Sequence, residues 1–296
     1  MCWGCLDGRG YMDIYQLRGA HIGPQTILEI SQDRHVALAN ARHCLIDAGS
    51  FERRYELLMG NFLAFEEFCA VAHLRSELRK DWSYETGDAL LMEANRHVIN
   101  LFTSGKTYMD QVARDFKSFG EEGEFARQAK HLAAAAYDNC LAYRLTCQLR
   151  DRSQHRALPV DGQEGGRGEH GLYASKDRIV ADRGKFKKSI LDETPDRIYL
   201  RRILREYMRE VNGIHLSLRS LVNDHVESSR QTVEAAIADY GQAQQFKGHA
   251  SATGIGLESC HYHDHSVVEA VPLLLNWDDL RLALARKNSF KLRFDD

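Results

Sequence analysis

Residues 91–116, "LMEANRHVINLFTSGKTYMDQVARDF", decide the fold. One set of positions recurs in alternating steps of four and three: Leu91, Asn95, Val98, Phe102, Gly105, Met109, Val112 and Phe116. This spacing predicts a helix with one face packed against other helices. Gly105 would allow a close helix approach, and Asn95 would need a hydrogen-bond partner if buried. We therefore interpret Asn95 as a structural residue.

The segments around this helix are also strongly helical. Breaks at "KDWSYETG" and "FGEEGE" separate three predicted helices, at about 51–80, 86–118 and 122–152. Residues 1–50 form a mixed N-terminal segment, in which "RHVALANARHCLI" fits a strand or a short helix equally well. The pattern predicts a mainly α protein with a helical bundle at 51–160 and small mixed N-terminal and C-terminal additions.

The chain after Pro159 changes character. Residues 161–195 predict a linker with short strands, because the stretch "DGQEGGRGEHG" is rich in glycine and "LYASKDRIVA" resembles a strand pair. Residues 196–296 predict a helical accessory region, with its main helix at 196–242. Thr194 is the expected cap of that helix, and Pro195 is its expected first residue.

The third predicted helix carries two apolar faces. The first contains Phe125, Ala129, Leu132, Ala136, Cys140, Tyr143 and Cys147, and three further residues bring it to Arg150. The second contains Leu141, Leu145 and Leu149. A helix with two apolar faces needs two partners. The second partner is either the later half of the chain or another subunit, and we expect a two-fold dimer that buries this leucine stripe.

Composition limits the possible functions. The chain has 296 residues and a net charge of −3, so a nucleic-acid partner would need a local basic patch. No uninterrupted apolar run approaches a membrane span, and the N-terminus does not resemble a secretory signal. Seven scattered cysteines predict reduced thiols in a cytoplasmic protein, and we interpret the Cys2–Cys5 pair as part of a loosely packed terminus.

A charged motif closes the third helix, in "LRDRSQHRALPV" at residues 149–160. Arg150 lies on an apolar stripe, and a buried guanidinium needs an anion or several acceptors. His155 follows five positions later, which places it about 140° from Arg150 on an ideal helix. The two side chains meet only if the helix frays before Pro159, or if a second subunit brings another copy of each.

This motif resembles that of HEPN-domain proteins, which carry an arginine, a polar residue, a short spacer and a histidine at the end of a helical bundle. The resemblance covers about residues 51–160. It implies a metal-independent ribonuclease whose two motifs meet across a homodimer axis, often in a toxin or a phage-defence effector. Other members of the family only bind RNA or a protein partner, which here would be antitoxin-like. The same loose Arg–His spacing recurs in Arg209–His215 and Arg219–His225, but within continuous helical pattern.

The residue types suit RNA cleavage by attack of a ribose 2′-hydroxyl. His155 would move the proton near neutral pH, and Arg150 would stabilise the extra charge of the phosphorane transition state. Asp151 would orient one of these two, or form only a cap or a surface ion pair. Arg152 and Arg156 would extend a positive patch toward the RNA backbone. The hypothesis needs no metal and no cofactor.

Two alternatives stay open at this point. The first is a non-enzymatic module that uses the same dimer to hold RNA or a protein partner. The second is a metal-dependent hydrolase built on "CHYHDH", because His261, His263 and His265 would share one face of a strand. No paired cysteine site or helical His-Glu-x-x-His accompanies that cluster, so we prefer an exposed polar strand or loop.

Overall fold

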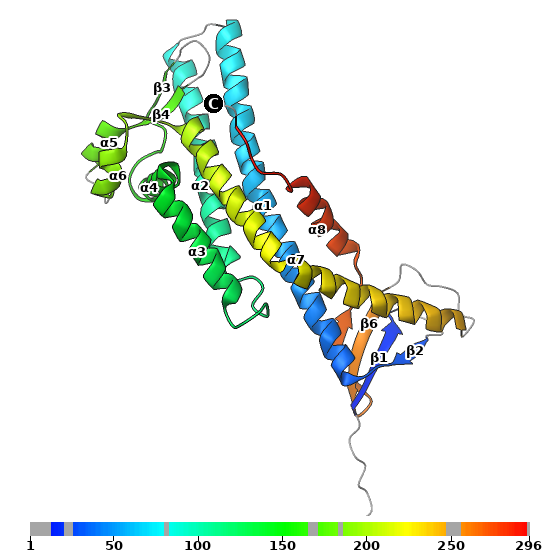
Figure 1. Cartoon of the computed structure of the whole chain (residues 1–296). Coiled ribbons are helices and arrows are strands. Elements are labelled where there is room, and N and C mark those ends of the chain that lie inside the picture. The colour runs from blue at the N-terminus through cyan, green and yellow to red at the C-terminus, as the bar shows by residue number, and fades with distance from the viewer. Residues whose placement is uncertain are drawn as a thin grey trace, which may run out of the picture. The chain divides into compact units, whose positions relative to one another are not determined.

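A computed structural model describes residues 13–20, 26–79, 83–164, 171–182, 186–246 and 256–294. The Cys2–Cys5 pair lies outside these residues. The protein is mainly α, as expected (Figure 1). The chain forms two compact units: residues 1–49 with 222–283, here called the sheet unit, and residues 50–221 with 284–296, here called the helical unit.

The helical unit is built from five helices or parts of helices. They are the later part of α1 (Gln32–Arg79), α2 (Tyr84–Val112), α3 (Glu124–Asn139), α4 (Leu141–His155) and the first part of α7 (Leu200–Phe246). A three-stranded antiparallel sheet and two short helices follow α4: β3 (Gly162–Glu164), β4 (Gly171–Ser175), α5 (Lys176–Ala181), α6 (Lys188–Glu193) and β5 (Arg197–Tyr199).

Helix α2 has the predicted face as far as Val112, where it ends, so Phe116, with a positive φ of 51°, lies beyond the helix that was expected to reach residue 118. Val98, Phe102 and Val112 are buried, and Ser83 caps the helix by accepting a hydrogen bond from the Thr86 amide at 3.3 Å. At Gly105, an added Cβ would lie 2.6 Å from the Tyr207 hydroxyl on α7. The glycine therefore permits the close helix approach expected from the sequence.

Asn95 is structural, as expected, and it ties α2 to the chain that leaves α4. Its side-chain Nδ2 donates to the Leu91 carbonyl at 2.9 Å and to the Val160 carbonyl at 3.4 Å. Its Oδ1 accepts a hydrogen bond from the Val160 amide at 2.9 Å. Because Asn95 is only 4% exposed, these bonds satisfy a buried amide and fix the path of the chain after His155.

The third predicted helix is two helices, which corrects the sequence expectation. Cys140 has an extended backbone (φ −122°, ψ 112°) and separates α3 from α4. Its sulfur accepts a hydrogen bond from the Tyr143 amide at 3.4 Å and so caps α4. Cysteine is not among the usual capping residues, and neither glycine nor proline marks this break.

The leucine stripe of α4 does not form the expected subunit interface. Leu145 is 2% exposed and Leu149 is fully buried, and both side chains pack within their own chain. Leu145 and Leu149 are therefore not available to a second subunit, whereas Leu141 at the start of α4 is half-buried.

Three boundaries also differ from the sequence expectations. Helix α1 begins at Gln32, so the ambiguous stretch "RHVALANARHCLI" is helical. The stretch expected to form two strands forms β4 and the helical turn α5 instead. Thr194 ends α6 rather than beginning α7: its hydroxyl donates to the Ile190 carbonyl at 2.6 Å, and β5 intervenes before α7 starts.

The sheet unit combines strands from an early and a late part of the chain. Four antiparallel strands are arranged in the order β2-β1-β6-β7: β1 (Asp13–Gly19), β2 (Ile27–Glu29), β6 (Leu257–His263) and β7 (Ser266–Pro272). Leu17 of β1 and Cys260 of β6 are fully buried. The unit also contains the start of α1, the end of α7 and most of α8 (Asn276–Lys287). The C-terminal region is therefore partly sheet, where we expected a helical region.

Helix α1 is unusually apolar for its exposure. It contains an 18-residue window with a mean hydropathy of 1.3, of which 28% is buried, and it is the one helix in the described residues with the length and composition to cross a membrane. Core helices of soluble proteins often have the same length and apolar composition. On the side toward α7, Glu66 of α1 accepts hydrogen bonds from Arg201 and Arg205 at 2.8 to 3.0 Å.

Candidate active site

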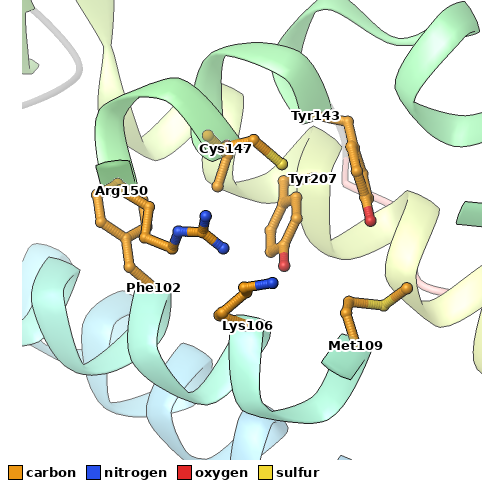
Figure 2. A pocket seen from close by; sticks show the side chains of 8 residues that line it. Phe102, Lys106, Met109, Tyr143, Cys147, Arg150 and Tyr207 are labelled. Atoms are coloured by element: carbon orange, nitrogen blue, oxygen red, sulfur yellow. The ribbon is translucent and has the colours of Figure 1, made fainter. Parts of the chain in front are cut away.

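Arg150 projects from α4 into a small pocket in the helical unit. Tyr143, Cys147 and Arg150 lie one helical turn apart on one face of α4, so all three line this pocket. The pocket has a volume of about 200 Å³. The remaining lining residues come from α2, α4 and α7: Phe102, Lys106, Met109, Thr146 and Tyr207. Figure 2 shows Arg150, Lys106 and Tyr207 reaching the same space from three different helices.

The two cations of the pocket each form an ion pair with a half-exposed carboxylate. The Arg150 side chain is 17% exposed, and its guanidinium binds Asp151 through Nε and a terminal nitrogen. Lys106 forms an ion pair with Asp110, one helical turn further along α2. Asp110 and Asp151 are about half exposed, so these pairs are surface interactions that an incoming anion can compete with.

Three hydroxyl groups complete the lining. Burial raises the pKa of both Tyr143 and Tyr207 well above the ordinary range, so both hydroxyls keep their protons. Neither hydroxyl has a hydrogen-bond partner among the described residues. The Thr146 hydroxyl is buried and also has no hydrogen-bond partner among the described residues.

The pocket is rich in hydrogen-bond donors. It combines a guanidinium, an ammonium and tyrosine hydroxyls that remain protonated at neutral pH, and a fixed set of donors of this kind suits an oxyanion such as phosphate. Its volume lies below the ~300 to 1,000 Å³ typical of sites for whole small molecules. The pocket therefore fits a single phosphate group of a larger ligand.

His155 lies outside this pocket. It is the last residue of α4 and is exposed to solvent. The helix does not fray before it, so the ideal separation from Arg150 of about 140° applies. Asp151 binds Arg150, and no hydrogen bond or ion pair joins it to His155 in the described part of the chain. The three expected catalytic residues therefore do not converge in one chain.

Arg152 is buried in ion pairs, whereas the expected RNA-binding role needs an exposed side chain. Its side chain is 5% exposed. The guanidinium donates to Asp182 at 2.6 Å, to both oxygens of Asp161 at 3.3 Å and to the Leu158 carbonyl at 3.1 Å. These contacts neutralise its charge and hold the chain that follows α4, so Arg152 offers nothing to an RNA backbone.

Arg156 is the more accessible of the two expected RNA contacts. It follows α4 directly and is exposed, and it donates one hydrogen bond, to the Asp182 carbonyl at 3.2 Å. Its charge has no carboxylate partner among the described residues. Arg156 and His155 thus form an exposed basic end of α4.

The two other Arg–His spacings are embedded in α7. His215 is fully buried and bonds the Tyr108 hydroxyl at 2.9 Å and Arg219 at 2.8 Å. It also stacks on Tyr55, with 3.7 Å between ring centroids. His215 is therefore part of the core. The exposed His131 on α3 is the better control for substitution of a histidine.

The histidine cluster lies in the sheet unit. His261 and His263 share one face of β6, as expected, and both contact the same oxygen of Asp13, at 3.0 and 2.8 Å. His265 lies in the following turn with a positive φ of 66°. No group of three His, Cys, Asp or Glu side chains in the described residues is arranged to hold a metal ion. Among the described residues, this cluster therefore does not have the arrangement of a metal site.

A serine–histidine–carboxylate arrangement was not foreseen in the same unit. His35 bonds Ser259 at 2.8 Å through Nδ1 and Glu269 at 3.2 Å through Nε2. Ser259 is fully buried, so its hydroxyl cannot reach a substrate. These bonds satisfy a histidine that is itself 2% exposed, and they join α1 to the sheet.

Sequence reasoning found Arg150 but missed its companions in the pocket. Lys106 and Tyr207 lie 44 and 57 positions from Arg150, so no short motif joins them. One signal was present: Tyr143, Cys147 and Arg150 continue a single stripe. No family model, curated protein or solved structure matches the chain.

Proposed function

We propose that the protein is a metal-independent endoribonuclease that holds an RNA phosphate in the Arg150 pocket. One observation carries the proposal: a guanidinium, an ammonium and two protonated tyrosine hydroxyls surround a space of about 200 Å³. The resemblance of Arg150-Asp151-x-x-x-His155 to the HEPN motif supports RNA as the source of that phosphate.

In this proposal the ribose 2′-hydroxyl is the nucleophile. A histidine removes its proton, the 2′-oxygen bonds to phosphorus, and the bond to the 5′-oxygen breaks. The leaving 5′-oxygen takes a proton from the now protonated histidine, which gives a 2′,3′-cyclic phosphate and a 5′-hydroxyl end and restores the neutral histidine. The non-bridging oxygens gain charge in the transition state, and Arg150 and Lys106 stabilise that charge once the phosphate has displaced Asp151 and Asp110 from them.

The histidine of each site comes from a second chain. His155 is exposed and points away from the pocket of its own chain, so it is free to serve the pocket of a partner. A two-fold dimer would then contain two composite sites, each with Arg150 from one chain and His155 from the other.

The test is cleavage of total RNA by the purified protein, with and without EDTA. Cleavage with EDTA present, ending in cyclic phosphates, is the expected result. Arg150→Ala and His155→Ala should each lower the rate by about a hundredfold or more. His131→Ala is the matched control and should cleave at the wild-type rate. A folded His155→Ala protein with full activity would refute the proposed chemistry.

A second candidate is a module that binds RNA, or an antitoxin-like protein, without cleaving it. The divergence of Arg150 and His155 within one chain favours it, because phosphate binding at Arg150 alone needs no histidine. This candidate predicts RNA binding that depends on Arg150, with no cleavage products and no effect of His155→Ala.

A further inference from the structure

A second cavity in the helical unit is a groove between the end of α1 and the start of α2. Its volume is about 820 Å³. The α1 wall includes Ala64, Glu67, Phe68, Val71 and Arg75, and the α2 wall includes Thr86, Leu90, Glu93 and His97. Gln163 of β3 also lines it. The residues that line the Arg150 pocket are entirely different, so this is a separate feature.

The α1 wall and its outer edge expose large apolar side chains. Val71 is 45% exposed, Leu74 is 56% exposed and Leu78 is 75% exposed. Steps of three and four residues place these three on one helix face. Leu63, at 57% exposed, extends the same face toward the middle of the helix. Exposed apolar side chains gathered on one helix face are of the kind that marks an interaction site.

Two charges interrupt the apolar stripe at equal distances from Val71. Glu67 precedes Val71 by four residues and Arg75 follows it by four. Both side chains are exposed, and neither forms an ion pair within the described part of the chain. The face is therefore acidic on one side of Val71 and basic on the other.

This pattern is self-complementary for two antiparallel copies of α1. A two-fold axis opposite Val71 sets each position before Val71 against the position equally far after it in the partner. Glu67 then faces the partner's Arg75, and this pair occurs twice. The same axis sets the small Ala64 against the large Leu78 of the partner.

We infer that the exposed face of α1 beside this groove docks a second copy of the chain, with the two α1 helices antiparallel about Val71. The apolar stripe supplies the buried surface, and the two Glu67–Arg75 pairs fix the register. The inference concerns assembly alone and goes beyond the proposed RNA chemistry. It also replaces the leucine stripe of α4, which is buried within its own chain, as the subunit contact.

The test is a charge exchange, read as molecular mass by light scattering at about ten micromolar. Wild-type protein should have about twice the chain mass of 33.8 kDa. Glu67→Arg and Arg75→Glu each create two like-charge contacts, so each variant alone should dissociate at least about tenfold more readily. An equimolar mixture of the two variants restores opposite charges at both contacts, so the mixture should again form dimers.

Recovery of dimers in the mixture would also show that both variants are folded, because mixing cannot restore a misfolded chain. Glu122→Arg, an equal charge change in the loop before α3, is the matched control and should stay dimeric. Monomeric wild-type protein, unaffected single variants or an unrestored mixture would each overturn the inference. So would a monomer that floats with phosphatidylcholine vesicles, because the face would then bind lipid. The measurement uses no RNA, so it stands apart from the proposed nuclease activity.

Discussion

Arg150 and His155 lie on one unbroken helix, α4, and point in directions about 140° apart. Arg150 enters a pocket with Lys106 and Tyr207, whereas His155 is exposed at the helix end. A phosphate bound in the pocket therefore lies on a different side of α4 from His155 of the same chain. This geometry separates phosphate binding from proton transfer and leads to the proposal of a two-chain site.

The phosphate pocket predicts a specific change in the salt dependence of RNA binding. Lys106→Ala removes one cation from the pocket, so the affinity for single-stranded RNA should fall. The slope of log K against log salt should decrease in magnitude by about 0.7. Filter binding at several salt concentrations measures both quantities. Lys130→Ala, an exposed α3 lysine outside the pocket, is the control. Equal effects of the two substitutions would indicate diffuse binding.

Arg152 should matter for stability. Arg152→Ala leaves Asp161 and Asp182 near each other without their shared cation, and we expect a loss of about 3 to 5 kcal/mol in the free energy of unfolding. Urea denaturation measures this loss. Arg156→Ala is the control, and its exposed side chain should change stability by less than about 0.5 kcal/mol. If both substitutions are neutral, Arg152 does not have the structural role described above.

The core histidine His215 predicts a pH dependence of stability. Burial lowers its pKa below the ordinary value of 6.5, although Glu52 acts in the opposite direction. The neutral ring accepts a hydrogen bond from Arg219. The unfolded chain binds the proton more tightly, so this stabilisation is complete above about pH 6.5 and is lost as the pH falls toward the lower folded value.

Thermal unfolding between pH 7 and pH 5 should show this loss in the wild type and a shallower pH dependence in His215→Leu. The substitution itself should cost about 2 to 4 kcal/mol at pH 7, because it removes a buried, hydrogen-bonded ring. An unchanged pH dependence in the variant would show that His215 does not titrate in this range.

The approach of α2 to α7 at the pocket can be tested with a double variant. Gly105→Ala sets a Cβ 2.6 Å from the Tyr207 hydroxyl, and we expect a loss of about 1 to 3 kcal/mol. Tyr207→Phe removes that hydroxyl, so the double variant should be more stable than the sum of the single effects predicts. Gly213→Ala is the control, since a Cβ there meets nothing within 4 Å. Additive losses would contradict the close approach.

The sequence predicted much of the helical unit because its local patterns are strong. The spacing of apolar residues along α2 predicted a packed helix. It also indicated structural roles for Gly105 and Asn95. The start of α1 was missed although a usual signal was present: the Ser31 hydroxyl accepts a hydrogen bond from the Arg34 amide at 3.2 Å, and Asp33 lies in the first turn. The break at Cys140 was missed because a sulfur cap has no usual sequence signal.

The candidate site was predicted only in part, for a different reason. Arg150 stood out as a charge on an apolar stripe, and that reasoning needs only local spacing. Lys106 and Tyr207 join it through tertiary packing of α2 and α7, which spacing does not encode. Arg152 looked like an RNA contact because its partners, Asp161 and Asp182, lie 9 and 30 residues further along the chain.

The most direct test of the two-chain site is complementation between inactive variants. Arg150→Ala and His155→Ala are purified separately, mixed in equal amounts, allowed to exchange subunits and assayed for RNA cleavage in EDTA. Half of the dimers then carry one chain of each kind, and each of these has one intact site of two. The two-chain site therefore predicts recovery of about a quarter of wild-type activity. A mixture no more active than either variant alone, with subunit exchange verified by mass, would contradict the account.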